Sequence, residues 1–194
     1  AHAQRLQNIT LESQAHLIAQ FYCELAERVR ATKAMEQARE YLEQAFAVEP
    51  ECIRARIILG RLAADEGRIE EAIEAFETVV EQDVDFVPEI LPPLLDCYAR
   101  MQQMQRAETF LLDIIDRYQG ISPVLALARI YTSTKGEAAA IDFLTRQLRH
   151  RPSVRGLMAL IDVSLDKASG EARDSFLILR DLTHKLLQGQ AMYR

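Results

Sequence analysis

The residues of this chain that could bind a metal ion or act as nucleophiles are few and far apart in the sequence. The four histidines are His2, His16, His150 and His184, and the three cysteines are Cys23, Cys52 and Cys97. No histidine lies three or four residues from a cysteine or another histidine, which is the spacing by which one helix presents two metal ligands. Isolated residues of these types are most simply surface histidines and small packing cysteines. We therefore predict no metal site in these residues and expect the chain to fold without zinc.

No local catalytic motif is present either. The sequence has no glycine-rich phosphate-binding loop, no nucleophile elbow and no HExxH. The nearest match to the end of a phosphate loop is Thr134, Lys135 and Gly136, which lacks the upstream glycines and predicts a turn between helices. The many acidic residues are expected on exposed helix faces, where no burial would shift their pKa values. We predict that the chain is not an enzyme.

A row of arginines remains, and its chemistry is that of binding. Guanidinium groups donate paired hydrogen bonds to carboxylates, so arginines gathered on one surface would suit an acidic extended or helical segment of another protein. The candidate groove residues are Arg30, Arg54, Arg61, Asp65, Arg100 and Arg129, interspersed with Gln20, Glu27 and Asp96. The alternative interpretation is a solvated face of mixed charge.

Helices must position these arginines, because apolar residues recur at helical spacing along the chain. Residues 53–86 predict two short helices folded back on each other, with Gly67 at the turn, where a left-handed C-cap is expected. The apolar stripes are Leu59, Gly60 and Ala63 on the first helix and Ala72, Phe76 and Val79 on the second. A shift of 34 residues aligns them with Leu25, Ala26, Ala38, Leu42 and Ala45. A helix pair repeated every 34 residues is the tetratricopeptide pattern.

The pattern predicts an all-α tetratricopeptide-repeat solenoid of antiparallel helix pairs over residues 1–194. Residues 1–18 are interpreted as the remnant of a preceding repeat, and the tail is 189–194. The repeats are 19–52, 53–86, 87–120 and 121–152, followed by a degenerate pair over 153–188. Pro92 and Pro93 predict that the first helix of the third repeat starts late, near Pro92, or kinks there, because proline lacks an amide hydrogen. First helices line the concave side of such a solenoid, which would bring the arginines together.

The composition is that of a foldable protein. The chain has 194 residues, of which 49% are apolar and 27% charged, and its net charge is −6. This balance argues against nucleic acid or a membrane surface as the main partner, because both attract clustered positive charge. No run of 18 or more apolar residues predicts a membrane-spanning helix. The odd number of widely spaced cysteines fits a reducing cytoplasm better than a disulfide framework.

Three stretches resemble one known family more closely than a repeat pattern requires. They are Ile18–Ala26 (IAQFYCELA), Phe143–Asp162 (FLTRQLRHRPSVRGLMALID) and Leu179–Leu187 (LRDLTHKLL), with the terminal Tyr193 and Arg194. These segments are similar to those of the lipopolysaccharide assembly protein B family of bacterial inner-membrane proteins. The resemblance covers nearly the whole chain and points to the tetratricopeptide-repeat region of that family's cytoplasmic domain.

The resemblance implies a set of partners. Members of the family carry an N-terminal membrane helix, the repeats, and a C-terminal rubredoxin-like zinc module, whose cysteines are expected after Arg194. Zinc is therefore implied for that module and no cofactor for these residues. The family is understood as an adaptor that links the membrane-bound protease FtsH to LpxC, the deacetylase of the committed step in lipid A synthesis, and a membrane regulator that senses lipopolysaccharide opposes it. The implied location is the cytoplasmic side of the bacterial inner membrane.

Two other functions remain open at this level. One is a general peptide-binding scaffold or co-chaperone repeat domain, although Cys23, Glu27, Ile57 and Arg61 occupy positions where some co-chaperones hold a C-terminal carboxylate with lysine and asparagine. The other is the repeat portion of an enzyme such as a glycosyltransferase, for which a second fold outside the repeat period would be expected. The sequence also leaves open whether the chain forms a homodimer.

Overall fold

The computed structural model describes residues 2–165 together with residues 173, 177 and 180, and the side chains from residue 14 onward. All the secondary structure assigned in these residues is α-helix or 3-10 helix, in agreement with the predicted all-α fold class. The chain divides into two compact units, Ala1–Gln103 and Met104–Arg194, and each is described by itself.

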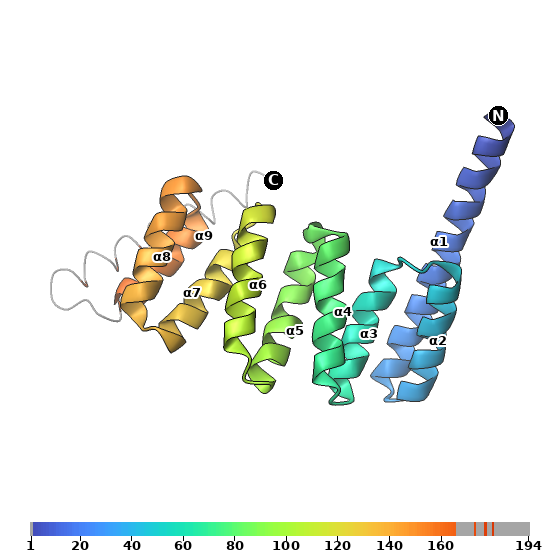
Figure 1. The fold of residues 1–194 in the computed structure, drawn as a ribbon, viewed down its shortest axis with the longest axis horizontal. Helices are drawn as coiled ribbons and strands as arrows, with labels where there is room; N and C mark the ends of the chain where they lie inside the picture. The colour runs from blue at the N-terminus through green and yellow to red at the C-terminus, as the bar shows by residue number, and fades with distance from the viewer. Residues whose placement is uncertain (1, 166–172, 174–176, 178–179, 181–194) are drawn as a thin grey trace. The chain divides into compact units, whose positions relative to one another are not determined.

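The first unit consists of two helix pairs and a fifth helix (Figure 1). Its elements are α1 (His2–Ala31), α2 (Met35–Val48), α3 (Ile53–Asp65), α4 (Ile69–Gln82), the 3-10 turn η1 (Val84–Phe86) and α5 (Val87–Arg100). Helix α1 packs on α2 and α3 packs on α4, and the first helices of successive pairs also meet, α1 with α3 and α3 with α5. The side chains of α1, α3 and α5 that point away from the second helices therefore share one surface, which we call the first-helix surface.

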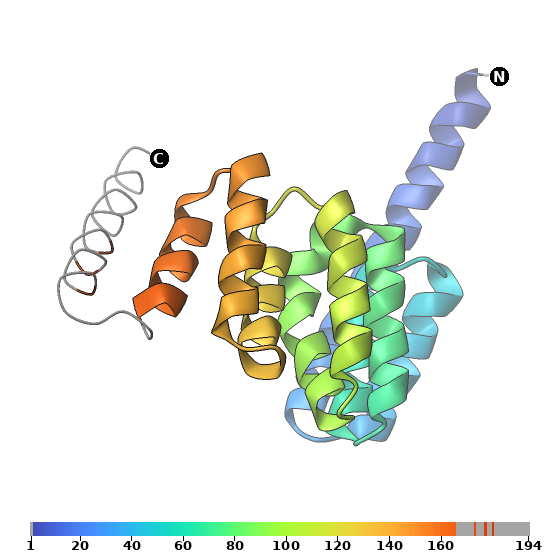
Figure 2. The ribbon, with the colours of Figure 1, turned by 60° about the vertical axis from the view of Figure 1, so that its left-hand side comes forward.

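The second unit contains α6 (Met104–Arg117), α7 (Ser122–Thr134), α8 (Glu137–His150) and α9 (Val154–Leu165). Each helix packs on the next one along the chain, and α7 also touches α9. Figure 2 shows α8 beside α9 from a second direction. Most of the second half of the degenerate pair predicted over 153–188, namely residues 166–188 except 173, 177 and 180, lies outside the described residues.

The 34-residue register predicted from the apolar stripes is confirmed by burial. Ala26 and Gly60 are buried at equivalent positions, as are Ala38 and Ala72, and the same pattern of burial recurs in the third repeat one residue out of phase. The buried members of that third set are Leu94, Tyr98, Ala107, Leu111 and Ile114, all between 0% and 1% exposed. In the second unit Leu127, Ala128, Ala140 and Leu144 are buried in the same way.

The same register recurs in the backbone of the turns between paired helices. Among the described residues, positive φ occurs at Lys33 (63°), Gly67 (79°), Gln102 (58°) and Gly136 (87°), at intervals of 34, 35 and 34 residues. At the Gly67 turn the amide of Arg68 donates to the carbonyl of Ala63 at 2.8 Å, which is the bond that closes a Schellman C-cap. The predicted cap at Gly67 is therefore confirmed, and the positions 33 and 102 adopt the same left-handed turn without glycine.

Close approach of α3 to α4 depends on the missing side chain of Gly60. A Cβ atom at this position would lie 2.7 Å from the ring of Phe76, which is fully buried. The ring thus occupies the space that any other residue would need, and a larger residue would push the two helices apart.

The prediction of a late start for the first helix of the third repeat is wrong. Helix α5 begins at Val87 and contains both Pro92 and Pro93. Each proline removes one helical hydrogen bond, to the carbonyl of Pro88 or of Glu89, and these two residues are exposed, so water can reach their carbonyls. The first turn is held instead by burial, since Val87, Ile90 and Leu91 are at most 4% exposed. Tertiary packing outweighs the local cost of the prolines.

The segment interpreted as the remnant of a preceding repeat does not form a helix of its own. Helix α1 runs without interruption from His2 to Ala31, 30 residues against the 14 of α2, and it extends well beyond the end of α2 (Figure 1). No glycine or proline occurs before Pro50, so nothing in residues 2–31 favours a turn.

Candidate partner-binding surface

Arginines of α3 connect to α1 across the first-helix surface. Arg54 donates to the amide oxygen of Gln20 at 3.2 Å and to the carboxylate of Glu24 at 2.5 Å. In the opposite direction, Arg30 of α1 donates to Asp65 of α3 at 2.6 Å and to Glu27 at 3.2 Å. Guanidinium groups thus link the first helices of two successive repeats.

The same arrangement continues from α3 to α5. Arg61 reaches Glu27 on one side at 3.5 Å and Glu89 on the other at 2.8 Å, so it joins three repeats. Arg100 of α5 donates to the backbone carbonyl of Ala64 at 3.2 Å. We call this set the arginine–carboxylate ladder; it consists of Glu24, Glu27, Arg30, Arg54, Arg61, Asp65, Glu89, Asp96 and Arg100.

The ladder follows the repeat length. Gln20 and Arg54 are 34 residues apart, and so are Glu27 and Arg61. Side chains at equivalent positions of stacked repeats lie next to each other, so a change of sign every 34 residues places opposite charges side by side. Glu24 and Glu89 were missed by the sequence reasoning, because they lie 30 and 28 residues from the arginines that they pair with and the 34-residue period does not point to them.

The ladder is close to electrically balanced. Its four guanidinium groups face five carboxylates, so Arg30, Arg54, Arg61 and Arg100 are not free cations in the isolated chain. The hydrogen bond from Arg54 lowers the pKa of Glu24 below its usual value, which keeps that carboxylate ionised at neutral pH. Most of these side chains are partly exposed, for example 40% for Arg54 and 53% for Glu24.

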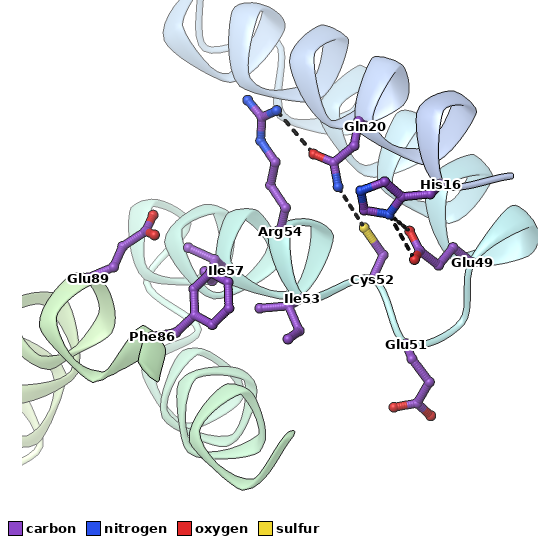
Figure 3. A pocket seen from close by; sticks show the side chains of 10 residues that line it. All are labelled: His16, Gln20, Glu49, Glu51, Cys52, Ile53, Arg54, Ile57, Phe86 and Glu89. Atoms are coloured by element: carbon purple, nitrogen blue, oxygen red, sulfur yellow. Dashed lines mark hydrogen bonds and ion pairs between the residues drawn. The ribbon is translucent and has the colours of Figure 1, made fainter. Parts of the chain in front are cut away.

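A cavity of about 450 Å³ opens beside the ladder (Figure 3). Its polar wall includes His16, Gln20 and Arg54, and its apolar wall includes Ile57 and Phe86. The remaining lining residues are Glu49, Glu51, Cys52, Ile53 and Glu89. His16 contacts Glu49 at 3.1 Å at one end of the cavity. The cavity therefore presents charged groups and an apolar wall, formed by Ile57 and Phe86, to the same ligand.

Two of the three cysteines meet in space, although the sequence separates them. Cys23 and Cys52 are buried with their sulfur atoms 3.9 Å apart, and both are free thiols. The expectation that all three cysteines are scattered therefore holds for Cys97 but not for this pair. Cys52 precedes α3, and a separation of 29 residues across the stacked repeats brings it against Cys23 on α1.

Arg129 is placed differently from the other predicted groove residues. It is exposed on α7 in the second unit and makes none of the contacts of the ladder. Among the described residues no hydrogen-bond acceptor or carboxylate pairs with it, which distinguishes it from Arg30, Arg54 and Arg61. The structure therefore brings together Arg30, Arg54, Arg61, Asp65 and Arg100, and leaves Arg129 as a separate exposed cation.

The described residues contain no group of three or more histidine, cysteine, aspartate or glutamate side chains that could hold a metal ion. Within the same described part, none of the helices combines the length and the apolar character needed to cross a membrane.

Comparison with known proteins agrees with the repeat geometry. The family model described as tetratricopeptide repeat matches residues 29–92, which cover the turn at position 33 and the whole α3–α4 pair. A structure of pilF from Pseudomonas aeruginosa superposes with a TM-score of 0.57 at 17% identity, covering 89% of this chain and 78% of that one. At this identity the likeness shows the fold alone.

Sequence comparison decides the closer relationship. Lipopolysaccharide assembly protein B of Escherichia coli strain K12 is 31% identical over 193 residues, which is 99% of this chain. The chain is a tetratricopeptide-repeat relative of lipopolysaccharide assembly protein B. The protein of the same name from Haemophilus influenzae is 30% identical over 193 residues. The chain spans about half the length of these curated relatives, 50% and 48% respectively.

Proposed function

We propose that this tetratricopeptide-repeat chain is part of a non-enzymatic adaptor in lipopolysaccharide assembly. The observation that carries the proposal is the alignment of 193 residues with lipopolysaccharide assembly protein B of Escherichia coli. Tetratricopeptide repeats form extended surfaces on which other proteins dock, which supports a binding role rather than a catalytic one. Because the chain spans about half of that relative, the proposal concerns protein binding by these repeats.

The proposed partners are the deacetylase LpxC and the protease FtsH, together with a membrane regulator that senses lipopolysaccharide. In this proposal the repeats hold LpxC for proteolysis by FtsH at the cytoplasmic side of the inner membrane and so limit lipid A synthesis. The support for these partners is the family resemblance. The structure adds a surface with the right properties for docking a protein segment.

Arg54 is the arginine of the ladder that is best placed to bind a partner. It borders the cavity, and its own ion pair with Glu24 is about half exposed on both sides. Exposed ion pairs of this kind are screened by solvent and contribute little to stability, so an incoming carboxylate can replace Glu24 at low cost. A partner that presents an acidic residue beside an apolar one would then bind Arg54 with its carboxylate and pack its apolar side chain on the wall formed by Ile57 and Phe86.

The test is titration calorimetry of the purified chain with purified LpxC and, separately, with the soluble part of FtsH. Arg54→Met keeps the aliphatic bulk and removes the guanidinium group. We expect the affinity for the deacetylase to fall by roughly 5- to 150-fold, corresponding to about 1–3 kcal/mol for a charge-assisted hydrogen bond. Binding should also weaken as salt is raised.

A matched control is Arg39→Met on α2. Arg39 is also an ion-paired arginine of the first unit, bonded to Glu66 at 2.6 Å, but it lies on a second helix. This variant should bind the deacetylase with the affinity of the unmodified chain. Equal affinities for all three proteins would mean that Arg54 belongs to a solvated face, and absence of binding to either partner would contradict the proposed function. Turnover of a lipid A precursor by the chain alone would contradict its non-enzymatic part.

A further inference from the structure

A pair of thiols that the binding role does not use lies at the cavity beside the ladder. Cys52 is 2% exposed and is one of the residues that line the cavity, while Cys23 is fully buried and does not line it. Their sulfur atoms are 3.9 Å apart. A disulfide requires about 2.05 Å, so an approach of roughly 2 Å would connect them.

The surroundings of Cys52 favour its thiolate. The side-chain amide of Gln20 points its nitrogen at this sulfur at 3.9 Å, and Arg54 holds that amide in place by donating to its oxygen at 3.2 Å (Figure 3). Cys52 is also the N-cap residue of α3, immediately before the helix, where the helix dipole favours negative charge. Donation from the Cys23 thiol lowers the pKa of Cys52 to about 7, against the opposing effect of burial.

The two remaining cysteines are held as thiols. The pKa of Cys23 is raised, first because its proton is shared with Cys52 and second because it is buried. Burial likewise raises the pKa of Cys97, which lies on α5 and is 1% exposed. Two acidic groups lie near the pair: Glu49, which contacts His16, and Glu24, which is bonded to Arg54. His16 also lines the cavity. Within this group, Cys52 alone combines a lowered pKa with a position on the cavity wall.

We propose that Cys52 and Cys23 form a thiol modification site, in which Cys52 reacts with small disulfides that enter the cavity and Cys23 resolves the adduct. In the first step the Cys52 thiolate attacks a disulfide RSSR, which forms Cys52–S–S–R and releases RS⁻, protonated to RSH. In the second step Cys23 loses its proton and attacks the Cys52 sulfur, which releases a second RSH. The chain is oxidised by two electrons and the small disulfide is reduced. The product would join α1 covalently to the start of α3.

The test uses 2-hydroxyethyl disulfide, a small uncharged probe, with the folded chain at pH 7. Peptide mapping by mass spectrometry should find an intramolecular Cys23–Cys52 disulfide, and two equivalents of mercaptoethanol should appear in solution. Cys97 serves as the internal control and should react at least about tenfold more slowly, because a buried thiol of raised pKa has little thiolate at this pH. An unmodified pair, or labelling of Cys97 as fast as Cys52, would overturn the proposal.

Two variants separate the roles of the cysteines. In Cys23→Ser the mixed disulfide on Cys52 should accumulate, because the resolving thiol is gone. In Cys97→Ser the intramolecular disulfide should form as in the unmodified chain. Circular dichroism of each variant checks that the helices are retained, and mapping of the unmodified chain decides the question independently of them. Resistance of Cys52 in folded Cys23→Ser would contradict its assignment as the reacting thiol.

Discussion

The two compact units use charge in different ways. In Ala1–Gln103 several ion pairs run from repeat to repeat, as between Arg61 and Glu27 or between Arg30 and Asp65, in addition to pairs within one helix such as Arg30–Glu27. Among the described residues of Met104–Arg194, the arginine pairs Arg117–Asp113 and Arg146–Asp142 instead stay within one helix, four residues apart. The inter-repeat arginine pairs of the first unit therefore connect successive first helices, while these two arginine pairs of the second unit each stabilise a single helix.

The second unit connects its helices by other polar contacts. Lys135 donates to Glu108 at 2.5 Å, and Arg151 donates to the backbone carbonyls of Ile115 and Tyr118 near the end of α6. One contact is common to both units, because Tyr98 donates to Glu77 and Tyr131 donates to Glu108, each from a first helix to the preceding second helix. The stacking plan is shared, and the inter-repeat ladder is the part that differs.

The largest expected effect is the loss of stability when a large core side chain is removed from one of the two units. Phe76→Ala would empty the space beside Gly60 in the first unit and should cost about 3–5 kcal/mol. Hydrogen exchange should then show lost protection in α3 and α4, with α7 and α8 much less affected, since stability in repeat proteins is largely a nearest-neighbour property. Phe143→Ala, also buried, is the reciprocal variant in the second unit. Equal loss of protection throughout would show that the units unfold together.

A smaller effect distinguishes the ladder from the lone arginine. Arg61→Met removes two ion pairs, so that Glu89 loses this partner and Glu27 keeps only Arg30, and we expect a loss of about 0.5–1.5 kcal/mol in urea unfolding. Arg129→Met in the second unit should change stability by less than about 0.5 kcal/mol. The difference should shrink in high salt, because partly exposed pairs are screened. Equal effects of the two substitutions would remove the distinction drawn between the units.

The smallest effect concerns acid. A bond from Arg68 lowers the pKa of Glu66 below its usual value of 4.5, and one from Lys135 lowers that of Glu108. A carboxyl whose pKa is lower when folded contributes stability above its usual pKa and loses it as the pH falls through the folded value. The Tm should therefore drop between about pH 5 and pH 3, and less steeply in Arg68→Met. A steeper drop in that variant would contradict the assignment.

Much of the fold could be predicted from the sequence because its signals are local. The 34-residue register of Ala26, Gly60, Ala38 and Ala72, and the left-handed turn at Gly67, depend on residues within one helix pair and its neighbour. The start of α5 could not be predicted in this way. Proline propensity is a local term, and burial of Val87, Ile90 and Leu91 against other helices outweighs it.

For the candidate site, too, some features follow from local sequence signals and others only from tertiary packing. The sequence by itself determined that arginines recur on first helices, since helical periodicity assigns each residue to a face. Only the tertiary structure decided that Arg54 and Arg61 are bonded to carboxylates of adjacent repeats, and that Cys52 lies 3.9 Å from Cys23. Those contacts join residues some 30 positions apart, and their partners follow from how closely and in what register the first helices stack. Periodicity within one helix carries no information about that register.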